Sequence, residues 1–439
     1  MNITHFSTRL NDGAGRGAYR LHQGLIDLGL NSTIITKHEG ISNKNVIQLF
    51  RNNTSGLGSN DVSQNSLIKH SFHSLRFLFQ EFKQRHEENK WVPKVLFNFN
   101  MPFVNIEKVK TILKNSDIIC LHSIQYFLSS EVIKKIHSIS NAPIVWTLWD
   151  IEPITGGCHF NDGCEKYAQN CGDCPQLHNN GANDLSRIIF NQKKHDFQNL
   201  PITFVTVSEN SRVQVKKSSL FNHSRVEKIL VGMEKEIYST IDISTARKVL
   251  NIPLEKKVIL FGCFNLDDYR KGGHLLIEAC KKMPEIFEND QKNIRDNFIL
   301  VTFGSKNHFD ASNIPFDWMH LDTVRDNISL NLIYNASDVF ACPSIDDIGP
   351  MMINEAYMCN TPIVAFDTGV GPDLIVDNIN GFIITNKDVS EFSKGLYNCL
   401  MQDTIQNNRS NVSVERNICS TEYQAESYLK LFKDLLSTK

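Results

Sequence analysis

Two carboxylates that lie eight positions apart mark the stretch of the sequence with the richest chemistry. Asp347 follows a short apolar run, and Glu355 comes about one turn into a predicted helix. A carboxylate can hold sugar hydroxyls, and the positive end of a helix dipole favours a phosphate. We therefore expect this stretch to hold a sugar, a phosphate and, through Glu355, a ribose diol. The residues at the start of the helix are Gly349, Pro350, Met351 and Met352.

Two adjacent cations, Arg270 and Lys271, form a second candidate element. They precede Gly272 and follow a predicted strand that ends at Gly262. Cations and free backbone N–H groups at a helix start suit a diphosphate. Simpler interpretations remain open for both elements. The two cations can be a solvated charge pair in a turn, and Glu355 can be a first-turn acid that stabilises its helix by about 0.3–1 kcal/mol.

The first loop of the chain matches the loose pattern G-x-G-x-x-A from Gly13 to Ala18. Gly13 and Gly15 would let a phosphate or a sugar approach the start of a helix. A dinucleotide is the rival ligand, but it needs an acidic ribose partner after the second strand, where the chain has Thr36 and Lys37. We therefore favour a substrate loop, and a plain glycine turn is the alternative.

Four of the eleven cysteines form a cluster with the spacing C-x5-C-x6-C-x2-C. Four thiolates suffice for a tetrahedral structural zinc, and a closing C-x2-C is a usual half-site. The loop is rich in glycine and poor in apolar residues, so a metal would explain how it becomes ordered. Two disulfides and four free thiols remain alternatives, although a reducing compartment disfavours disulfides. The cysteines are Cys158, Cys164, Cys171 and Cys174.

Short apolar runs alternate with amphipathic stretches, which is typical of βαβ units and parallel sheets. Ligands of such sheets bind outside the carboxyl ends of the strands, where the loops described above lie. We predict one Rossmann-like domain over 1–222 and another over 223–420, which face each other across a deep cleft, with the boundary near 222–250. A last helix over 421–437 can pack back on the first domain. The predicted strands are Asn2–Phe6, Asn31–Thr36, Asp117–Leu121, Ile144–Leu148, Phe204–Val207, Lys257–Gly262, Phe298–Gly304, Val339–Pro343 and Pro362–Phe366, and the other predicted helices lie within Gly13–Leu30, Gly272–Lys282, Leu330–Ala336 and Met351–Cys359.

Length and charge limit the class of protein. A chain of 439 residues with 41% hydrophobic residues can bury a core, which excludes global disorder. Lys and Arg number 46 against 48 Asp and Glu, and this balance argues against a protein built to grip nucleic acid. The sequence shows no apolar run long enough to span a membrane and no signal peptide at its start. We therefore expect a cytoplasmic protein.

The order of these motifs resembles the retaining glycosyltransferases of family 4, which have the GT-B fold. The pair Asp347-x7-Glu355 is similar to the E-x7-E donor motif of that family, and the segment 270–272 is similar to its R-K-G phosphate element. In the first half of the chain, the segment 13–21 is similar to a G-A-x-R-A-A-Y-R-L loop. Similar elements extend over residues 1–385.

The segments 146–150 and 155–159 are similar to a branch of the family that builds bacterial surface polysaccharides such as capsule and lipopolysaccharide. The resemblance implies transfer of a sugar from a nucleotide-diphosphate donor, of the UDP or GDP type, to a hydroxyl of a saccharide or lipid-linked acceptor. It implies that the anomeric configuration is retained and that the leaving phosphate accepts the acceptor proton. No cofactor is implied for catalysis.

The resemblance also implies roles for single residues. Asp347 would position the donor sugar, while Lys271 and Arg270 would neutralise the departing diphosphate. Asp150 would assist as a base or as an acceptor clamp. The implied acceptor side consists of His122, Trp149, Asp150 and Arg16, and the implied donor side consists of Gly13, Gly15, Gly262, Lys271, Gly349, Pro350, Met351, Met352 and Glu355.

Three positions depart from the family pattern. The first acid is Asp347 rather than Glu, and its shorter side chain changes its reach to the donor sugar. Cys263 stands where the family has a phosphate-binding arginine, so that Arg270 would have to substitute. Trp149 stands where a histidine near the transferred sugar is usual, and its simpler role is packing.

These departures leave alternatives open. The chain can be a GT-B protein that binds nucleotide sugars without turning them over, or, less favoured, an NAD-dependent enzyme. His122 can equally be a core histidine. Residues 67–85 are apolar and basic, which suits peripheral contact with the cytoplasmic face of the inner membrane as well as a helix packed on its own domain. Residues 40–66, rich in Asn, Ser and Gly, predict a mobile loop.

Overall fold

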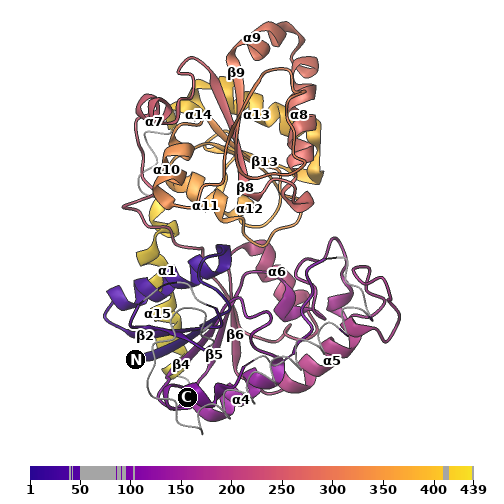
Figure 1. Cartoon of the computed structure of the whole chain (residues 1–439), viewed down its shortest axis with the longest axis vertical. Helices are drawn as coiled ribbons and strands as arrows, with labels where there is room; N and C mark the ends of the chain where they lie inside the picture. Colours follow the sequence, from indigo (N-terminus) through magenta and orange to yellow (C-terminus); the bar gives the residue numbers. More distant parts are fainter. Residues whose placement is uncertain are drawn as a thin grey trace, which may run out of the picture. The chain divides into compact units, whose positions relative to one another are not determined.

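The chain forms two compact units, each with its own sheet (Figure 1). The structure is a computed structural model, and it describes residues 1–38, 41, 43–49, 86, 90, 95–101, 104–408 and 415–437. All strand pairs in both sheets are parallel in this described part, which confirms the prediction of two Rossmann-like α/β domains. The first unit comprises Met1–Thr206, Arg212–Lys228 and Ala425–Lys439, and the second comprises Val207–Ser211 and Ile229–Gln424.

The first unit contains a seven-stranded sheet, counted over the described residues, with the strand order β3-β2-β1-β4-β5-β6-β7. Strands β4 and β5 are buried along their whole length, as expected of apolar runs covered on both faces. The order reverses at β1, which pairs with β2 on one side and β4 on the other. Such a reversal is where ligands bind in open α/β sheets. The strands are β1 (Asn2–Ser7), β2 (Asn31–Thr36), β3 (Val46–Gln48), β4 (Ile118–Leu121), β5 (Ile144–Leu148), β6 (Ile202–Thr206) and β7 (Val226–Lys228).

A side-chain cap sets the start of the first helix, and a buried tyrosine assigns the last helix to the first unit. The Asp12 carboxylate accepts a hydrogen bond from the Gly15 N–H at 2.7 Å and so caps the glycine-rich loop as the start of α1. Tyr428, on the last helix, is fully buried and shares a hydrogen bond of 2.8 Å with Thr147 on β5. The C-terminal part of the last helix therefore belongs to the first unit. The helices are α1 (Gly13–Asp27), α3 (Lys110–Lys114), α4 (Ser130–Ser140), α5 (Leu185–Phe197), α6 (Glu209–Lys217) and α15 (Thr421–Ser437), of which α6 and α15 begin in the second unit.

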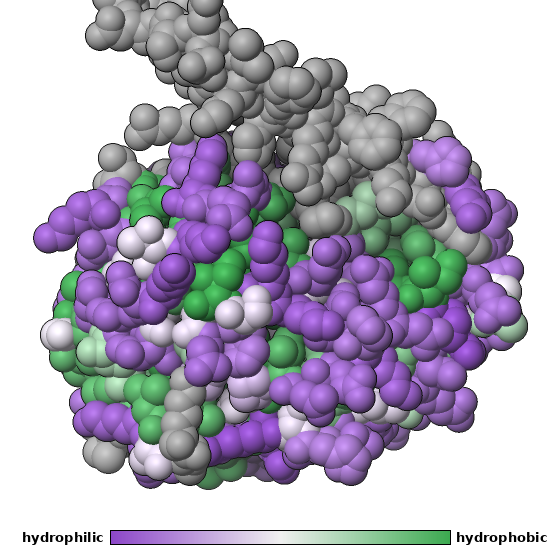
Figure 2. All heavy atoms as spheres, turned by 90° about the horizontal axis from the view of Figure 1, so that it is seen from below, coloured by the Kyte–Doolittle hydropathy of each residue, from purple (hydrophilic) through white to green (hydrophobic). Residues whose placement is uncertain are grey.

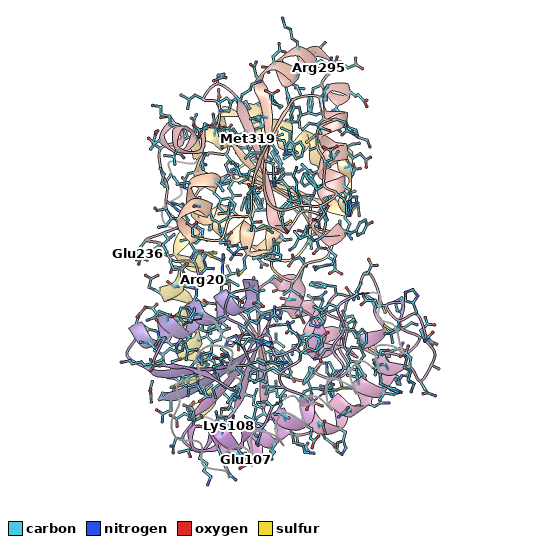
Figure 3. The ribbon with its side chains drawn as sticks, in the orientation of Figure 1. Arg20, Glu107, Lys108, Glu236, Arg295 and Met319 are labelled. Atoms are coloured by element: carbon cyan, nitrogen blue, oxygen red, sulfur yellow. The ribbon has the colours of Figure 1, made fainter. Side chains whose placement is uncertain are left out.

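The second unit contains a six-stranded sheet, again within the described residues, with the order β10-β9-β8-β11-β12-β13. Helices α8 and α13 pack against each other, and α13 also covers β12 and β13. Side chains fill the space between this sheet and its helices (Figure 3). The strands are β8 (Lys257–Asn265), β9 (Phe298–Ser305), β10 (Asp317–Leu321), β11 (Val339–Cys342), β12 (Ile363–Phe366) and β13 (Gly381–Ile384), and the helices are α7 (Ile243–Leu250), α8 (Gly273–Ile286), α9 (Gln291–Asn297), α10 (Asn327–Asn335), α11 (Met351–Met358), α12 (Gly371–Leu374), α13 (Val389–Met401) and α14 (Asp403–Asn408).

The nine predicted strands are all present, and the deviations have physical causes. The strand predicted to end at Gly262 continues to Asn265, because a bulge between these residues lets the chain pass the end of the apolar run. Strands β3, β7, β10 and β13 were not predicted, since each is short and only partly buried. Strand β3 lies within 40–66, so that part of the predicted mobile loop is ordered. The segment 67–85 and the rest of 40–66, apart from the few residues named above, lie outside the described residues.

Hydrophilic side chains cover most of the described surface in the view of Figure 2, and hydrophobic ones gather only in small groups. Scattered apolar side chains on a surface need no functional explanation. We therefore look for the site in the strand-end loops rather than on this face.

Candidate functional site

Two loops of the second unit meet where the neighbouring strands β8 and β11 end. The loop after β8 contains the two predicted cations, and the loop after β11 contains Asp347. The Ile345 N–H donates to the Arg270 carbonyl at 2.8 Å and ties the loops together. Gly272 has a φ of +72°, and a Cβ there would lie 1.8 Å from the Pro343 carbonyl oxygen. Only glycine permits this close approach, which explains its place after the cations.

Lys271 and Asp347 form an ion pair between these loops, in which Lys271 Nζ donates to Asp347 Oδ2. Their side chains are 20% and 12% exposed. Asp347 Oδ1 also accepts from the Gly349 N–H at 3.2 Å. Burial lowers the pKa of Lys271, but the charge and the hydrogen bond of Asp347 outweigh it, so that the pKa stands above its ordinary value. Lys271 is therefore charged at neutral pH.

Arg270 is directed to another acid. Its Nη2 donates to Asp268 Oδ2 at 2.6 Å, and the two side chains are 31% and 28% exposed. The Arg270 N–H also donates to Asp268 Oδ1 at 3.0 Å. The structure therefore pairs Lys271 with Asp347, and it pairs Arg270 with Asp268, two residues before it in the same loop.

Glu355 is buried, with only 3% of its surface exposed. Tyr334 Oη donates to Glu355 Oε2 at 2.8 Å, and Tyr238 Oη donates to Oε1 at 3.3 Å. Burial raises the pKa of Tyr334 well above its ordinary value, and the neighbouring carboxylate adds to the rise. The two tyrosines were missed at the sequence level, where nothing in their spacing connects them to Glu355. The ribose role of Glu355 stays a prediction.

The start of α11 lacks a side-chain cap. Pro350 occupies the N-cap position, and its side chain makes no capping hydrogen bond. Gly349 packs against Val207, because a Cβ at position 349 would lie 2.6 Å from Val207 Cγ2. The backbone around Met351 and Met352 thus fits the prediction of a phosphate-binding helix start, which stays a prediction.

Cys263, which replaces the expected arginine, is turned into the core. Only 4% of the Cys263 surface is exposed, and the thiol donates a hydrogen bond to the Asn265 carbonyl at 3.1 Å. Burial raises its pKa to about 12, so the thiol is neutral and unreactive at neutral pH. The bulge that follows turns Phe264 outward, where it is 88% exposed. Gly262 packs against the Phe303 ring, from which a Cβ would be 2.0 Å away.

In the first unit, the predicted acceptor residues His122 and Trp149 lie together at the ends of β4 and β5. Trp149 Nε1 donates to His122 Nδ1 at 3.4 Å, and His122 Nε2 lies 3.0 Å from His5 Nδ1. Because an indole N–H only donates, His122 must carry its proton on Nε2 and donate it to His5. Burial lowers the pKa of His122 to about 3. His5, which the sequence interpretation missed, therefore joins a neutral, buried histidine pair.

The glycine-rich loop reaches the same place through Gly17, since a Cβ there would lie 2.2 Å from Trp149 Cη2. The indole thus rests against the backbone of α1. Gly15 lies close to the Arg9 carbonyl, with a Cβ distance of 2.3 Å. The Arg16 Nε is buried, and among the described residues no hydrogen-bond partner reaches it. Gly13 is the first residue of α1. The structure therefore brings this loop to Trp149.

Asp150 is held by the loop that follows it. Its Oδ2 lies 2.8 Å from His159 Nδ1, and its Oδ1 accepts from the Glu152 N–H at 2.8 Å. Glu152 in turn pairs with Lys193, and both side chains are almost fully buried. His159 and Lys193 were missed at the sequence level; the only available signal was the closeness of His159 to the first cysteine.

The four clustered cysteines are free thiols in the structure, and Cys158, Cys171 and Cys174 lie close enough to influence one another. Burial raises the pKa of Cys171 to about 12, and the Cys174 and Cys164 thiols add to the rise. Among the described residues, no three His, Cys, Asp or Glu side chains are arranged to hold a metal ion. Structural zinc therefore stays a prediction, which metal analysis of protein purified without chelator tests.

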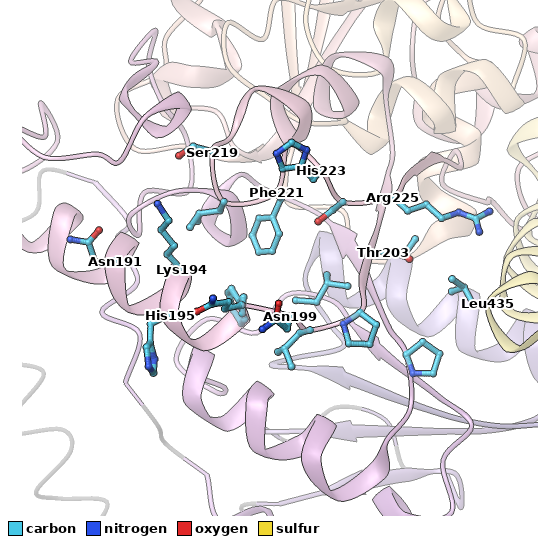
Figure 4. A pocket seen from close by; sticks show the side chains of 18 residues that line it. Asn191, Lys194, His195, Asn199, Thr203, Ser219, Phe221, His223, Arg225 and Leu435 are labelled. Atoms are coloured by element: carbon cyan, nitrogen blue, oxygen red, sulfur yellow. The ribbon is translucent and has the colours of Figure 1, made fainter. Parts of the chain in front are cut away.

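A hollow of about 960 Å³ lies at the opposite edge of the first sheet, where β5 and β6 begin (Figure 4). Lys194 and His223 line it, and Phe221 forms part of its wall. Parallel α/β sheets bind ligands at the carboxyl ends of their strands, so we do not place the site in this hollow.

Comparisons with known proteins find glycosyltransferases among the relatives of this chain. Residues 242–413 match the family model of glycosyl transferases group 1. The chain is 21% identical to the putative colanic acid biosynthesis glycosyl transferase WcaC of Escherichia coli K12, over 99% of this chain and 100% of that protein.

Solved structures show the same fold. HepE of Anabaena in complex with UDP superposes with a TM-score of 0.62 at 16% identity, over 99% of this chain and 100% of HepE. WaaG, a glycosyltransferase involved in lipopolysaccharide biosynthesis, gives a TM-score of 0.62 at 15% identity, over 97% and 99% of the two chains. No helix in the described part of the chain has the length and apolar character needed to cross a membrane. The two parallel sheets and the solved neighbours give the chain the GT-B fold, and its residues 242–413 match the model of the glycosyl transferases of group 1.

Proposed function

We propose that the protein transfers a sugar, with retention of anomeric configuration, from a nucleotide-diphosphate sugar of the UDP or GDP type to a hydroxyl of a saccharide or lipid-linked saccharide. The observation that carries this proposal is the Lys271–Asp347 pair, which joins two strand-end loops inside the region that matches the family model. A cation for the diphosphate and a carboxylate for the sugar hydroxyls are the two groups that such a donor needs at adjacent positions.

The chemical step asks little of the protein. A nucleoside diphosphate is already a good leaving group, so the protein must stabilise its developing charge rather than protonate it strongly. Lys271 and the uncapped N–H groups at the start of α11 are suited to this task, because preorganised donors aimed at developing charge are worth several kcal/mol, about 2.7–4 for one oxyanion donor. The leaving phosphate then accepts the proton of the acceptor hydroxyl, so no protein nucleophile is required.

The acceptor belongs, in this proposal, to the strand ends of the first unit. Trp149 offers an aromatic face to a sugar, and Asp150 offers a carboxylate oxygen to an acceptor hydroxyl. Asp150 is oriented for this by His159, at 2.8 Å. A positioned carboxylate contributes by holding the hydroxyl in line with the donor carbon.

The relatives suggest a biological setting. One is named for colanic acid biosynthesis and another for lipopolysaccharide biosynthesis, and HepE was solved with UDP. We extend this to the present chain as a proposal: it builds a bacterial surface polysaccharide at the cytoplasmic face of the inner membrane, and segment 67–85 is the candidate for peripheral contact with that membrane.

A donor screen by heat stability tests the proposal. A bound nucleotide raises the free energy of unfolding by RT ln(1 + [L]/Kd), so UDP-, GDP- and ADP-sugars that bind stand out from those that do not. The stabilising donor is then offered with surface-polysaccharide fragments and lipid-linked acceptors, and NMR of the product reports the anomeric configuration. An inverted product would refute retention, and stabilisation by NAD alone would replace the proposal with a dinucleotide enzyme.

One observation favours a second candidate, a binding protein without turnover. Cys263 replaces the phosphate-binding arginine with a buried neutral thiol, which removes one positive charge from the site. Binding of a nucleotide sugar with neither transfer nor hydrolysis, across the same panel, would establish this alternative.

A further inference from the structure

The charge around Lys271 is already balanced by the protein. Of the three positions at which the resemblance places cations for the diphosphate, position 263 is a neutral thiol and Arg270 is paired with Asp268. Lys271 is paired with Asp347 and is 20% exposed. A diphosphate that approaches Lys271 therefore meets an ammonium group that a carboxylate already holds.

A bound anion and Asp347 cannot both contact Lys271 without a cost in binding free energy. If the diphosphate binds beside the intact pair, it lies next to the Asp347 carboxylate, and like charges at short range repel strongly in a partly buried site. If it replaces Asp347 on Lys271, the carboxylate loses its partner while it is only 12% exposed, and a buried charge without a partner is costly. Among the described residues, Asp347 then retains the hydrogen bond from the Gly349 N–H, at 3.2 Å.

A nucleotide sugar removes this cost, whereas a nucleoside diphosphate does not. The sugar brings hydroxyl groups that donate hydrogen bonds to a carboxylate, and such charge-assisted bonds are strong. The diphosphate without its sugar brings none. The exchange of Lys271 from Asp347 to the diphosphate is therefore favourable for the donor substrate and unfavourable for the product left after transfer.

We propose that Asp347 competes with the diphosphate for Lys271 and thereby makes the site prefer a nucleotide sugar to the nucleoside diphosphate. This inference rests on the proposed function and adds to it a means of product release. It requires no new bond: the ammonium group changes its partner from a carboxylate to a phosphate oxygen, and the carboxylate changes its partner from the ammonium group to sugar hydroxyls.

Asp347→Asn tests the competition, because the amide keeps the shape of the side chain and removes its charge. We expect UDP to bind this variant at least about threefold more tightly than the wild-type chain, while turnover of the nucleotide sugar falls at least about tenfold. The opposite signs distinguish competition from a simple loss of structure. UDP is the first probe, and GDP and ADP are run beside it, with affinities measured by calorimetry and inhibition constants measured against the donor.

Two further variants make the test specific. Asp268→Asn removes the same charge from the neighbouring loop after β8, where the carboxylate pairs with Arg270 rather than with Lys271. In a Lys271→Ala background, Asp347→Asn should no longer tighten UDP binding, because the group for which the two compete is gone. Asp347→Ser serves as a second substitution if the asparagine variant folds poorly, as judged by its unfolding temperature.

The outcomes separate the inference from the proposed function. Tighter UDP binding in Asp347→Asn alone, absent in the Lys271→Ala background, supports the competition. Equal tightening in Asp268→Asn would reduce it to a general charge effect and overturn it, as would unchanged or weaker UDP binding in Asp347→Asn while the wild-type chain transfers sugar. If no nucleoside diphosphate and no nucleotide sugar binds the wild-type chain, the proposed function fails and the inference fails with it.

Discussion

The strand ends of the two sheets differ in electrostatic character. In the first unit, the buried and neutral His5–His122 pair lies against the half-buried Trp149, and the Asp150–His159 pair follows in the loop after β5. In the second unit, the corresponding loops contain ion pairs, with Lys271 on Asp347 and Arg270 on Asp268. Both sheets are parallel and end their strands in the same way, so the fold does not impose this difference.

This electrostatic difference indicates which kind of ligand the strand ends of each sheet can hold. Neutral aromatic and imidazole groups suit an uncharged saccharide, which they contact through ring faces and hydrogen bonds. Fixed charges in a partly buried loop suit an anion, whose charge they must neutralise. We therefore expect substitutions in the second unit to affect donor binding and turnover, and substitutions in the first unit to affect stability and acceptor use.

The largest effect is expected for Lys271→Ala. Loss of the ammonium group removes stabilisation of the departing diphosphate, and kcat/KM should fall by about 100-fold, as for other preorganised groups at a developing charge. Steady-state kinetics with the donor found in the screen measure it. Lys282→Ala is the matched control, because Lys282 is an exposed lysine of α8 that pairs with Glu278. Equal, small losses in both variants would remove the 270–271 loop from the site.

Glu355→Gln should weaken donor binding by about 10-fold or more, since hydrogen bonds to a charged group contribute about 1.5–3 kcal/mol. Calorimetry with UDP and with the donor measures this loss. Glu278→Gln, an exposed acid of the same unit, controls for net charge.

Because Tyr334 and Tyr238 also donate to the Glu355 carboxylate, the variant must be checked for folding. Tyr334→Phe separates the two roles: it removes a tyrosine contact and keeps the carboxylate. Wild-type kinetics in Glu355→Gln would show that the ribose assignment is wrong.

Gly17→Ala tests how the first unit holds Trp149. The added methyl group would lie 2.2 Å from the indole, so the ring must move, at a cost of about 1–3 kcal/mol in unfolding free energy. Alanine is the better helix former, so the measured loss understates the clash. Denaturant unfolding and the acceptor KM are the readouts. Gly181→Ala is the control, because nothing lies within 4 Å of a Cβ at that position. Equal stability of the two variants would contradict the contact.

The effect that is smallest at neutral pH is the acid sensitivity of the buried histidines. Burial lowers the pKa of His22 to about 4, below its ordinary value near 6.5. Between these two pKa values the unfolded chain binds a proton on His22 and the folded chain does not. The free energy of unfolding therefore falls as the pH drops from about 6.5 towards 4, by about 1.4 kcal/mol per pH unit for one histidine. His22→Gln should flatten this slope by about one proton, as measured by unfolding between pH 7.5 and 4.5. His195→Gln, at an exposed position, should leave it unchanged.

Much of the architecture could be predicted from the sequence, because it depends on local patterns of apolar and polar residues. Apolar runs such as 118–121 and 144–148 predict buried strands, since parallel strands covered on both faces are apolar throughout. The eight-residue spacing of Asp347 and Glu355 placed one acid in a loop and the other on the following helix, as observed. Partly buried strands such as β3 and β10 were not predicted, because their sequence patterns resemble those of loops.

The partners of the site residues were decided only by the tertiary structure. Lys271 meets Asp347 across 76 positions of sequence, and His5 meets His122 across 117, distances over which no pattern in the chain acts. Side-chain direction was equally hidden: the bulge in β8 turns Cys263 inward and Phe264 outward, and only the pairing of β8 with β9 creates that bulge. Residue types and spacing therefore determined which groups are available for chemistry. The packing of strands decided which of them face one another, because that depends on contacts between segments far apart in the chain.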